Sequence, residues 1–256
     1  MATKRKKTIV ELIHNRHLSL YKDLNEIQIF ISEITPLLES ATIEYKEVFI
    51  DPDDGASYII QKERGSERAA RRNYIKLSSL FKRFVNRDLY ENFLVSSVSR
   101  FEFYLSDVIR EFLRASSTKL SLGLKGGESK KQFPVQLVAN SNNLNELTEK
   151  IIDCRLQAIF YAKPKDYCAY FKAVSELDIF PEQFAAFFEI KATRDLIVHN
   201  SLVVNDKYLE KADKLRRGEL GDKLKVTKDY FENSISAMKN LSNIIDKKTH
   251  EKYYKP

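Results

Sequence analysis

One stretch of sequence decides the fold, and it reads PEQFAAFFEIKATRDLIVHN at residues 181–200. Apolar side chains recur in it at helical spacing, at Phe184, Phe187, Phe188, Ile190 and Ile197. Pro181 suits the first turn of a helix, where its missing N–H removes no hydrogen bond. The polar run His199-Asn200-Ser201 closes the pattern. We therefore predict a helix from Pro181 to about this run, with its apolar side in a core.

The end of this predicted helix carries polar groups suited to chemistry. Arg194 and His199 stand about 140° apart around a helix axis and about 7.5 Å along it. Asp195 is four residues before His199, so the two share a face and can touch. A guanidinium, an imidazole and a carboxylate that orients it suit metal-free cleavage of a phosphodiester. The residues equally fit a structural interpretation, in which Arg194 and Asp195 form ion pairs and His199 caps the helix.

The rest of the chain predicts an all-α protein. Glycine is scarce, with 7 residues in 256, which disfavours a fold with many tight turns. Apolar residues at helical spacing predict helices at residues 18–34 (ended by Pro36), 90–113, 144–161, 167–177 and 228–246. Residues 43–60 fit a small β-hairpin, although so short an apolar run also fits a helix. We predict a mostly helical N-terminal extension (1–88), a helical-bundle domain (89–248) and a C-terminal tail (249–256).

Basic residues gather in two places that could contact RNA. Between Lys62 and Arg87 nine basic residues face two acidic ones, and Arg68, Arg71 and Arg72 are the candidates for contacting phosphates. A glycine-containing loop supplies three further candidates, Lys125, Lys130 and Lys131. The alternative is a solvated helix face and a solvated loop. The formal net charge of +7 permits a polyanionic partner without requiring one.

Several classes of protein find no support in the sequence. No apolar run approaches the roughly 20 residues of a membrane span, and no signal-peptide pattern follows the basic N-terminus. Cys154 and Cys168 are too few for a disulfide framework, which favours a cytoplasmic location. Metal-ligand spacing is absent, as are the glycine motifs of nucleotide-binding enzymes. We expect no metal, no cofactor and no membrane partner.

The stretch 193–200, TRDLIVHN, resembles the nuclease motif of the HEPN superfamily, and within it the RiboL-PSP-HEPN group. A second match is the stretch 99–110, SRFEFYLSDVIR, which resembles the opening helix of that group. The resemblance covers about residues 90–247, and residues 1–88 match nothing comparable. It implies a helical bundle that dimerises and places two motifs in one composite cleft. It also implies metal-independent endoribonuclease activity on tRNA, rRNA or mRNA, frequently in toxin–antitoxin or anti-phage systems with a restraining partner protein.

The resemblance assigns roles to four residues. His199 acts as general acid or base, Arg194 stabilises charge on the phosphorane, and Asp195 orients the imidazole. Asn200 either donates to a phosphate oxygen or caps the helix. Two alternatives remain from the sequence: a catalytically silent HEPN module that binds RNA, a nucleotide or a protein, and an unrelated helical interaction protein with His199 packed as a cap.

Overall fold

The computed structural model describes residues 7–47, 55–61, 67–124 and 135–254. These residues form an all-α protein with one two-stranded antiparallel hairpin, which confirms the predicted fold class. The elements in chain order are α1 (Ile9–Glu47), β1 (Gly55–Gln61), β2 (Glu67–Asn73), α2 (Tyr74–Arg83), the π-helical turn η2 (Phe84–Asp88), α3 (Leu89–Ala115), the 3₁₀ turn η3 (Ser117–Ser121), α4 (Val135–Ala139), α5 (Leu144–Phe160), α6 (Pro164–Ser175), α7 (Pro181–Asn200), α8 (Asp206–Ala212), the 3₁₀ turn η4 (Asp213–Leu215) and α9 (Lys228–Tyr253).

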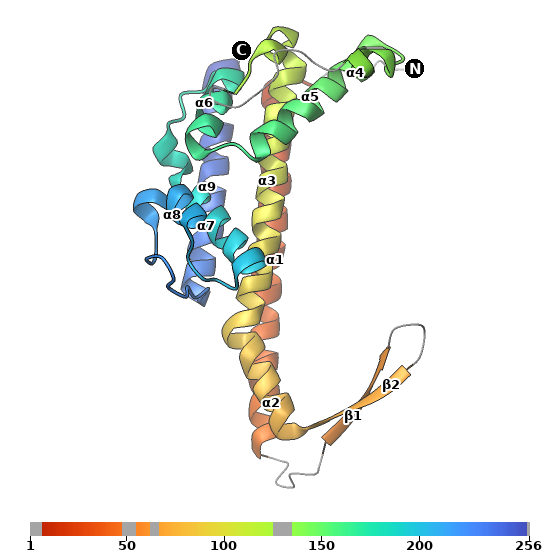
Figure 1. The fold of residues 1–256 in the computed structure, drawn as a ribbon, viewed down its shortest axis with the longest axis vertical. Helices are drawn as coiled ribbons and strands as arrows, with labels where there is room; N and C mark the ends of the chain where they lie inside the picture. Colours follow the sequence, from red (N-terminus) through yellow and green to blue (C-terminus); the bar gives the residue numbers. More distant parts are fainter. Residues whose placement is uncertain (1–6, 48–54, 62–66, 125–134, 255–256) are drawn as a thin grey trace.

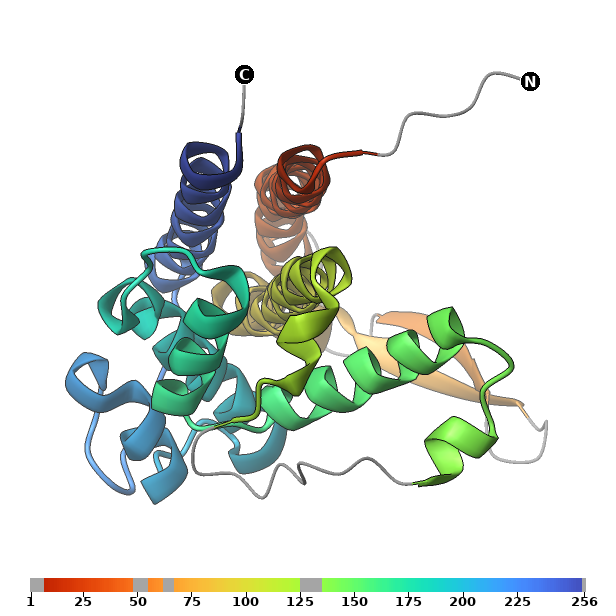
Figure 2. The same cartoon turned by 90° about the horizontal axis from the view of Figure 1, so that it is seen from above.

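Three long helices, α1, α3 and α9, lie side by side and form the body of the molecule (Figures 1 and 2). Their facing sides are apolar at helical spacing, and Leu24, Phe101 and Met238 are fully buried between them. The shorter helices α5 to α8 cover one side of α3 and α9 (Figure 1). In the described part of the chain, no helix is both long and apolar enough to cross a membrane.

Helix α1 continues through Pro36, where the sequence predicts an end or a kink. A proline inside a helix removes one backbone hydrogen bond and strains the preceding turn. Contacts beyond the proline stabilise the last turns of α1 against α2. The ring of Tyr45 stacks on Tyr74 and Phe81, and the Ser78 hydroxyl donates to the backbone oxygen of Thr42 at 2.9 Å. Tertiary packing therefore outweighs the local cost of the proline.

The hairpin exists, but its strands differ from the predicted ones. β1 pairs with β2, with Tyr58 opposite Ala70, whereas residues 42–47 belong to α1. The end of the expected first strand (48–50) and most of the expected turn (51–54) lie outside the described residues. Residues 67–73 are extended rather than helical because they pair with β1, a partner that periodicity alone does not reveal. The hairpin projects away from the body at the far end of α1 (Figure 1).

The boundary predicted near residue 88 does not separate two packed units. Residues 9–31 of α1 contribute Ile13, Leu20 and Leu24 to the same core as α3 and α9. Backbone helix also runs without a break from α2 through η2 into α3. The predicted tail is likewise mostly helical, since α9 continues to Tyr253, whose hydroxyl donates to the Ser175 carbonyl at 2.8 Å. The end of α1, the hairpin and α2 extend beyond the bundle at one end of the molecule (Figure 1).

Helix α7 starts at Pro181 and ends at Asn200, as its sequence predicts, and it packs against α3, α6, α8 and α9. Its apolar side reaches the core, where the rings of Phe187 and Phe101 lie 4.9 Å apart. The helix ends because Ser201 adopts the left-handed conformation, with φ of 49°. The next amide, that of Leu202, then donates back to the Leu196 carbonyl at 3.0 Å. This turn leaves the last residues of α7 at the surface.

Candidate active site

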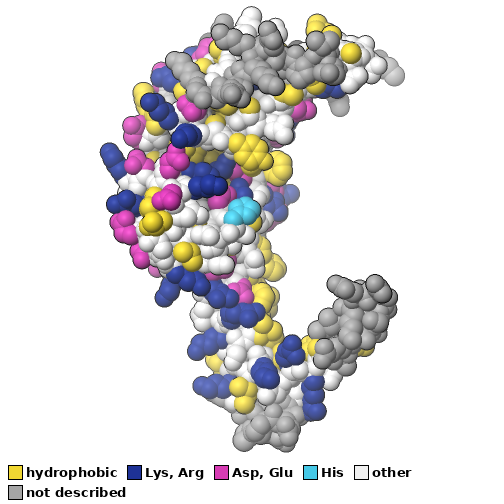
Figure 3. Space-filling model, viewed as in Figure 1, with side chains coloured by type: hydrophobic (Ala, Val, Ile, Leu, Met, Phe, Trp, Pro, Cys, Tyr) yellow, Lys and Arg dark blue, Asp and Glu magenta, His cyan; other side chains and the backbone are white. Residues whose placement is uncertain are grey.

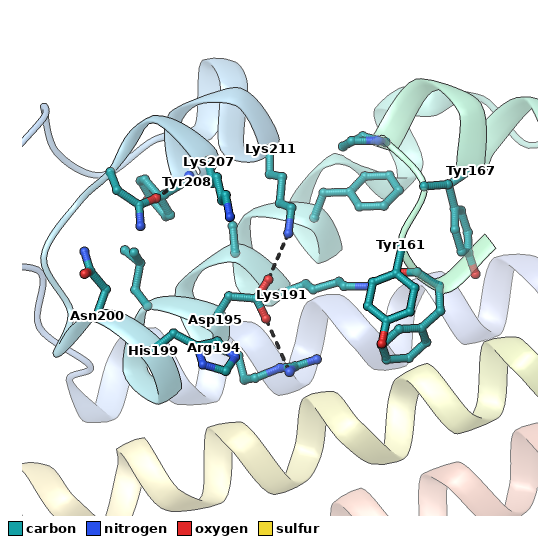
Figure 4. A pocket seen from close by; sticks show the side chains of 17 residues that line it. Tyr161, Tyr167, Lys191, Arg194, Asp195, His199, Asn200, Lys207, Tyr208 and Lys211 are labelled. Carbon is teal, nitrogen blue, oxygen red and sulfur yellow. Dashed lines mark hydrogen bonds and ion pairs between the residues drawn. The ribbon is translucent and has the colours of Figure 1, made fainter. Parts of the chain in front are cut away.

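A cleft of about 560 Å³ lies beside the C-terminal half of α7, between α8 and the connection from α5 to α6 (Figure 4). It is lined by all four side chains that the sequence predicts for the site: Arg194, Asp195, His199 and Asn200. Their meeting in one cleft follows from their positions within two turns of a single helix. What each side chain does there depends on partners from other elements.

Arg194 is held by an acidic side chain from α3 that the sequence does not reveal. Its Nη2 donates to Oε2 of Glu102, which is buried with only 7 % of its side chain exposed. Its Nη1 lies 3.3 Å from Oδ1 of Asp195, a longer contact. Its Nε is buried and has no hydrogen-bond partner among the described residues. The guanidinium is therefore anchored at one end and incompletely satisfied at the other.

Lys191 shares the same carboxylate. Its Nζ lies 2.7 Å from Oε1 of Glu102, although that oxygen receives no well-aligned hydrogen bond from the described residues. The ammonium also donates to the backbone oxygen of Phe160 at 3.2 Å and lies 4.5 Å from the centre of that residue's ring. Because Lys191 precedes Arg194 by three residues, both cations project from one side of α7 onto Glu102.

Asp195 does not hold the His199 imidazole, contrary to the predicted role. Its Oδ2 accepts a hydrogen bond of 2.9 Å from Lys211 of α8, and its Oδ1 faces Arg194 (Figure 4). Across the described residues it makes no hydrogen bond to the histidine. Two fixed cations compete with the imidazole for the carboxylate, and charge-assisted contacts of this kind are the stronger ones. Asp195 therefore ties α7 to α8 and positions Arg194.

His199 is exposed at the end of α7, and its ring lies beside the Arg194 side chain (Figure 4). It makes no hydrogen bond or ion pair with any residue that the structure describes. Asn200 points away from this pair, and its Nδ2 donates to the Val203 carbonyl at 2.6 Å. Of the two roles predicted for Asn200, the geometry supports the capping one. Arg194 and His199 are the two motif side chains left for chemistry.

The remaining lining makes the cleft cationic with aromatic walls. Lys207 is exposed, forms no ion pair with any described residue, and reaches from α8 toward the cleft together with Lys211 (Figure 4). Tyr167 and Tyr208 are buried in the walls, and burial raises the pKa of each phenol above its usual range. Both therefore stay protonated at neutral pH.

The predicted RNA-binding residues lie elsewhere or outside the described residues. Arg71 and Arg72 are exposed on β2, at the far end of the molecule from the cleft (Figure 1). Basic side chains gather over α2 and the base of the hairpin (Figure 3). The side chain of Arg68, and Lys125, Lys130 and Lys131, fall outside the described part of the chain. The structure brings neither Arg71 nor Arg72 into the cleft, and contact of the six predicted residues with RNA stays a prediction.

Comparisons with protein-family models, curated proteins and solved structures return no match for this chain. The resemblance to the HEPN superfamily therefore rests on the two matching stretches quoted above. In the ranges that the structure describes, no three His, Cys, Asp or Glu side chains lie close enough together to bind a metal ion.

Proposed function

We propose that this protein is a metal-independent endoribonuclease of the HEPN type that acts as a homodimer. The observation that carries the proposal is the cleft itself. An exposed imidazole and an anchored guanidinium lie side by side at the end of α7, and lysines from two helices surround them. Such a cleft attracts a phosphodiester and offers it a group that can move protons.

The chemistry uses the nucleophile that RNA carries. The ribose 2′-OH attacks the adjacent phosphorus while His199 accepts its proton, and the bond from phosphorus to the 5′-oxygen breaks. Arg194 and the lysines neutralise the charge that develops on the phosphorane oxygens. The departing 5′-oxygen takes a proton from an acid, which the His199 of a second copy supplies. The products are a 2′,3′-cyclic phosphate and a 5′-hydroxyl, and the reaction needs no oxidant, metal or added water.

The dimer in this proposal is supported by apolar surface beside the site. Phe103 follows Glu102 on α3 and is 74 % exposed, and Val198 precedes His199 and is 51 % exposed. Large apolar side chains next to a polar site are typical of surfaces that another chain covers. A second copy placed over them would bring two histidines together, which provides one base and one acid.

A silent binding module is the second candidate, and one observation favours it. The guanidinium of Arg194 already contacts two carboxylates, Glu102 and Asp195. Fewer donors are then open to a phosphate than in an unpaired arginine. The contact with Asp195 is the longer of the two, so a phosphate oxygen has to replace it for catalysis to proceed. A toxin or anti-phage role, a restraining partner and a cytoplasmic location are further parts of the first proposal and rest on the resemblance.

The experiment that tests the proposal incubates the purified protein with total tRNA and rRNA in excess EDTA and determines the product ends. We expect fragments with 2′,3′-cyclic phosphates. We also expect no cleavage of an oligonucleotide whose 2′-hydroxyls are replaced by hydrogen. Cleavage of the 2′-deoxy oligonucleotide, or loss of RNA cleavage in EDTA, would contradict the mechanism. Binding of RNA without any product would instead support the silent module.

A further inference from the structure

One side chain at the mouth of the cleft has no role in the chemistry above. Tyr161 follows the last residue of α5 and lines the same cleft as Arg194 and His199. Its side chain is 82 % exposed, and within the described residues it makes no hydrogen bond through its hydroxyl. A ring this exposed gains little from the fold and is open to contact with a ligand in the cleft.

The backbone segment that carries the ring is short and hydrogen-bonded. The Tyr161 amide donates to the Ile159 carbonyl at the end of α5, and the Ala162 amide donates to the same oxygen at 3.0 Å. Pro164 then begins α6, so only a few residues join the two helices. The side chain of Tyr161 has two rotatable bonds, and ordering it costs little entropy. The cleft therefore presents a nearly preorganised aromatic face.

The position of this ring is also coupled to the polar cluster. The rings of Phe160 and Tyr161 meet edge to face, with centres 5.5 Å apart and planes at 74°. Lys191 contacts both the ring and the backbone oxygen of Phe160, and it reaches Glu102, which anchors Arg194. One lysine thus joins the aromatic mouth to the guanidinium, and Figure 4 shows Tyr161, Lys191 and Arg194 along one side of the cleft.

A planar ring beside a group of cations matches the two parts of a nucleotide. The cations Lys191, Lys207 and Lys211 suit the sugar–phosphate backbone, while an exposed tyrosine ring can stack on a nucleobase. A base inside a double helix is already stacked on both faces and cannot reach such a ring. An unpaired base can, whatever its sequence, because every base has an aromatic face.

We propose that Tyr161 is a base-stacking subsite and that the cleft takes an unpaired nucleotide of single-stranded RNA. The proposal deepens the ribonuclease function and rests on it for the identity of the ligand. It assigns Tyr161 a part in binding and in the choice of substrate, not in proton transfer. Double-stranded RNA enters the cleft only where a loop, bulge or end exposes a base.

The test measures binding separately from cleavage. The probe is a mixed-sequence single-stranded RNA of about 12 nucleotides, within the range that single-strand sites cover. All its 2′-hydroxyls are methylated, so that it cannot be cut. A second probe has the same backbone without bases, and a third is the blunt duplex. Each is titrated against wild type, Tyr161→Ala, Tyr161→Phe and the control Tyr254→Ala, which removes an exposed tyrosine at the far end of α9.

We expect Tyr161→Ala to weaken binding of the single strand about 5- to 150-fold, the effect of losing one stacked base. Tyr161→Phe and Tyr254→Ala should bind it like wild type, since the first keeps the ring. All variants should bind the baseless backbone equally, and wild type should bind the duplex more weakly than the single strand. Equal binding of the single strand by wild type and Tyr161→Ala overturns the subsite. The subsite is also overturned if Tyr161→Phe binds the single strand as weakly as Tyr161→Ala, if wild type binds the duplex more tightly, or if wild type binds no probe.

The two proposals fail separately. If the protein cuts RNA and Tyr161→Ala binds normally, the subsite is wrong and the ribonuclease stands. If the Tyr161 effect is present and no RNA is cut under any condition above, the subsite belongs to a silent RNA-binding module. If the cleft binds a peptide instead of RNA, none of the RNA probes will bind to wild type.

Discussion

Helix α7 contributes side chains to two carboxylate-centred clusters, and they differ in how completely their polar groups are satisfied. The first is centred on Glu189. Its Oε1 accepts hydrogen bonds from Thr193 at 2.8 Å, Tyr208 at 3.0 Å and Arg217 at 2.9 Å. Its Oε2 accepts one from Tyr230 at 2.7 Å. The second cluster is centred on Glu102 and consists of that residue, Lys191 and Arg194.

The Glu189 cluster is closed, whereas the Glu102 cluster is open. Arg217 lies 3.5 Å from the ring centre of Tyr230, its Nη2 donates to the Thr193 hydroxyl, and its Nη1 donates to the Lys225 carbonyl. In the Glu102 cluster Arg194 Nε and Glu102 Oε1 lack hydrogen-bond partners among the described residues, and the cluster opens into a cleft. Buried polar groups are normally satisfied, so the exceptions are where function is sought. The Glu189 cluster therefore stabilises the fold, whereas the Glu102 cluster leaves polar atoms unsatisfied beside the cleft.

The largest effect is expected for a substitution that breaks the Glu189 cluster. Glu189→Ala leaves Arg217 and two phenols without their common acceptor, and should lower the free energy of unfolding by about 3 kcal/mol. Urea denaturation measures it. The matched control is Glu182→Ala in the exposed first turn of the same helix, where a loss below about 1 kcal/mol is expected. Similar losses in the two variants would show that the Glu189 cluster contributes no special stability.

The second-largest effect tests whether Glu102 serves cleavage of RNA or only balances buried charge. Glu102→Gln keeps the shape of the side chain and removes the charge that anchors Arg194 and Lys191. We expect the rate constant for RNA cleavage to fall by about tenfold, or 1.4 kcal/mol, because the guanidinium loses its position. Glu102→Asp should retain more activity than Glu102→Gln.

Glu111→Gln is the control for that prediction. Glu111 is another buried glutamate of α3, paired with Arg16 at 2.9 Å and distant from the cleft along the helix. Both substitutions should lower stability, but only the one at Glu102 should change the cleavage rate constant. An equal rate for Glu102→Gln and wild type would mean that the anchor does not serve catalysis.

The smallest effect concerns His17, which lies in a polar segment near the N-terminus that predicts a place at the surface. His17 is buried between α1 and α9, with its Nδ1 at 2.6 Å from the Ser242 hydroxyl. Burial lowers the pKa of His17, and His14 lowers it further, while Asp246 opposes the shift. The unfolded chain then binds a proton more readily than the native state as pH falls below about 6.5. Stability should therefore decrease over that acidic range and be fully present above it.

Urea midpoints at about pH 7.5 and about pH 5.5 measure this change, in a window where histidine titrates. His17→Gln should show a weaker dependence on pH than wild type. The exposed His250 provides the control, and His250→Gln should behave like wild type. An unchanged pH dependence in His17→Gln would assign the acid sensitivity to other groups.

The sequence predicts α7 and its motif well because the information is local. Pro181, the spacing of the phenylalanines and the polar end define the helix, and residues within two turns of one helix end share a cleft. Glu102 is out of reach, because it lies 92 positions before Arg194 and meets it only in the folded chain. The contact between Lys211 and Asp195 cannot be predicted from the sequence for the same reason. It holds the Asp195 carboxylate, which then does not bind His199.

The wrong predictions for the end of α1 and for the hairpin have the same origin. Periodicity cannot tell that β1 pairs with residues 67–73, or that contacts between Tyr45 and α2 hold α1 past Pro36. These outcomes depend on pairings between distant segments, which outweigh local preference. The burial of His17 is hidden from the sequence because its hydrogen-bond partner Ser242 lies on α9, more than two hundred positions later.

The most direct test of the central claim is the cleavage rate of His199→Ala, measured with its urea midpoint on the same preparation. His199 is exposed and has no partner among the described residues, so its removal should change the free energy of unfolding by less than about 0.5 kcal/mol. Cleavage in EDTA should fall by about 10²- to 10⁴-fold, the usual contribution of a general acid or base. His250→Ala should retain wild-type activity. Wild-type cleavage by His199→Ala would contradict the assignment of the α7 cleft as an active site.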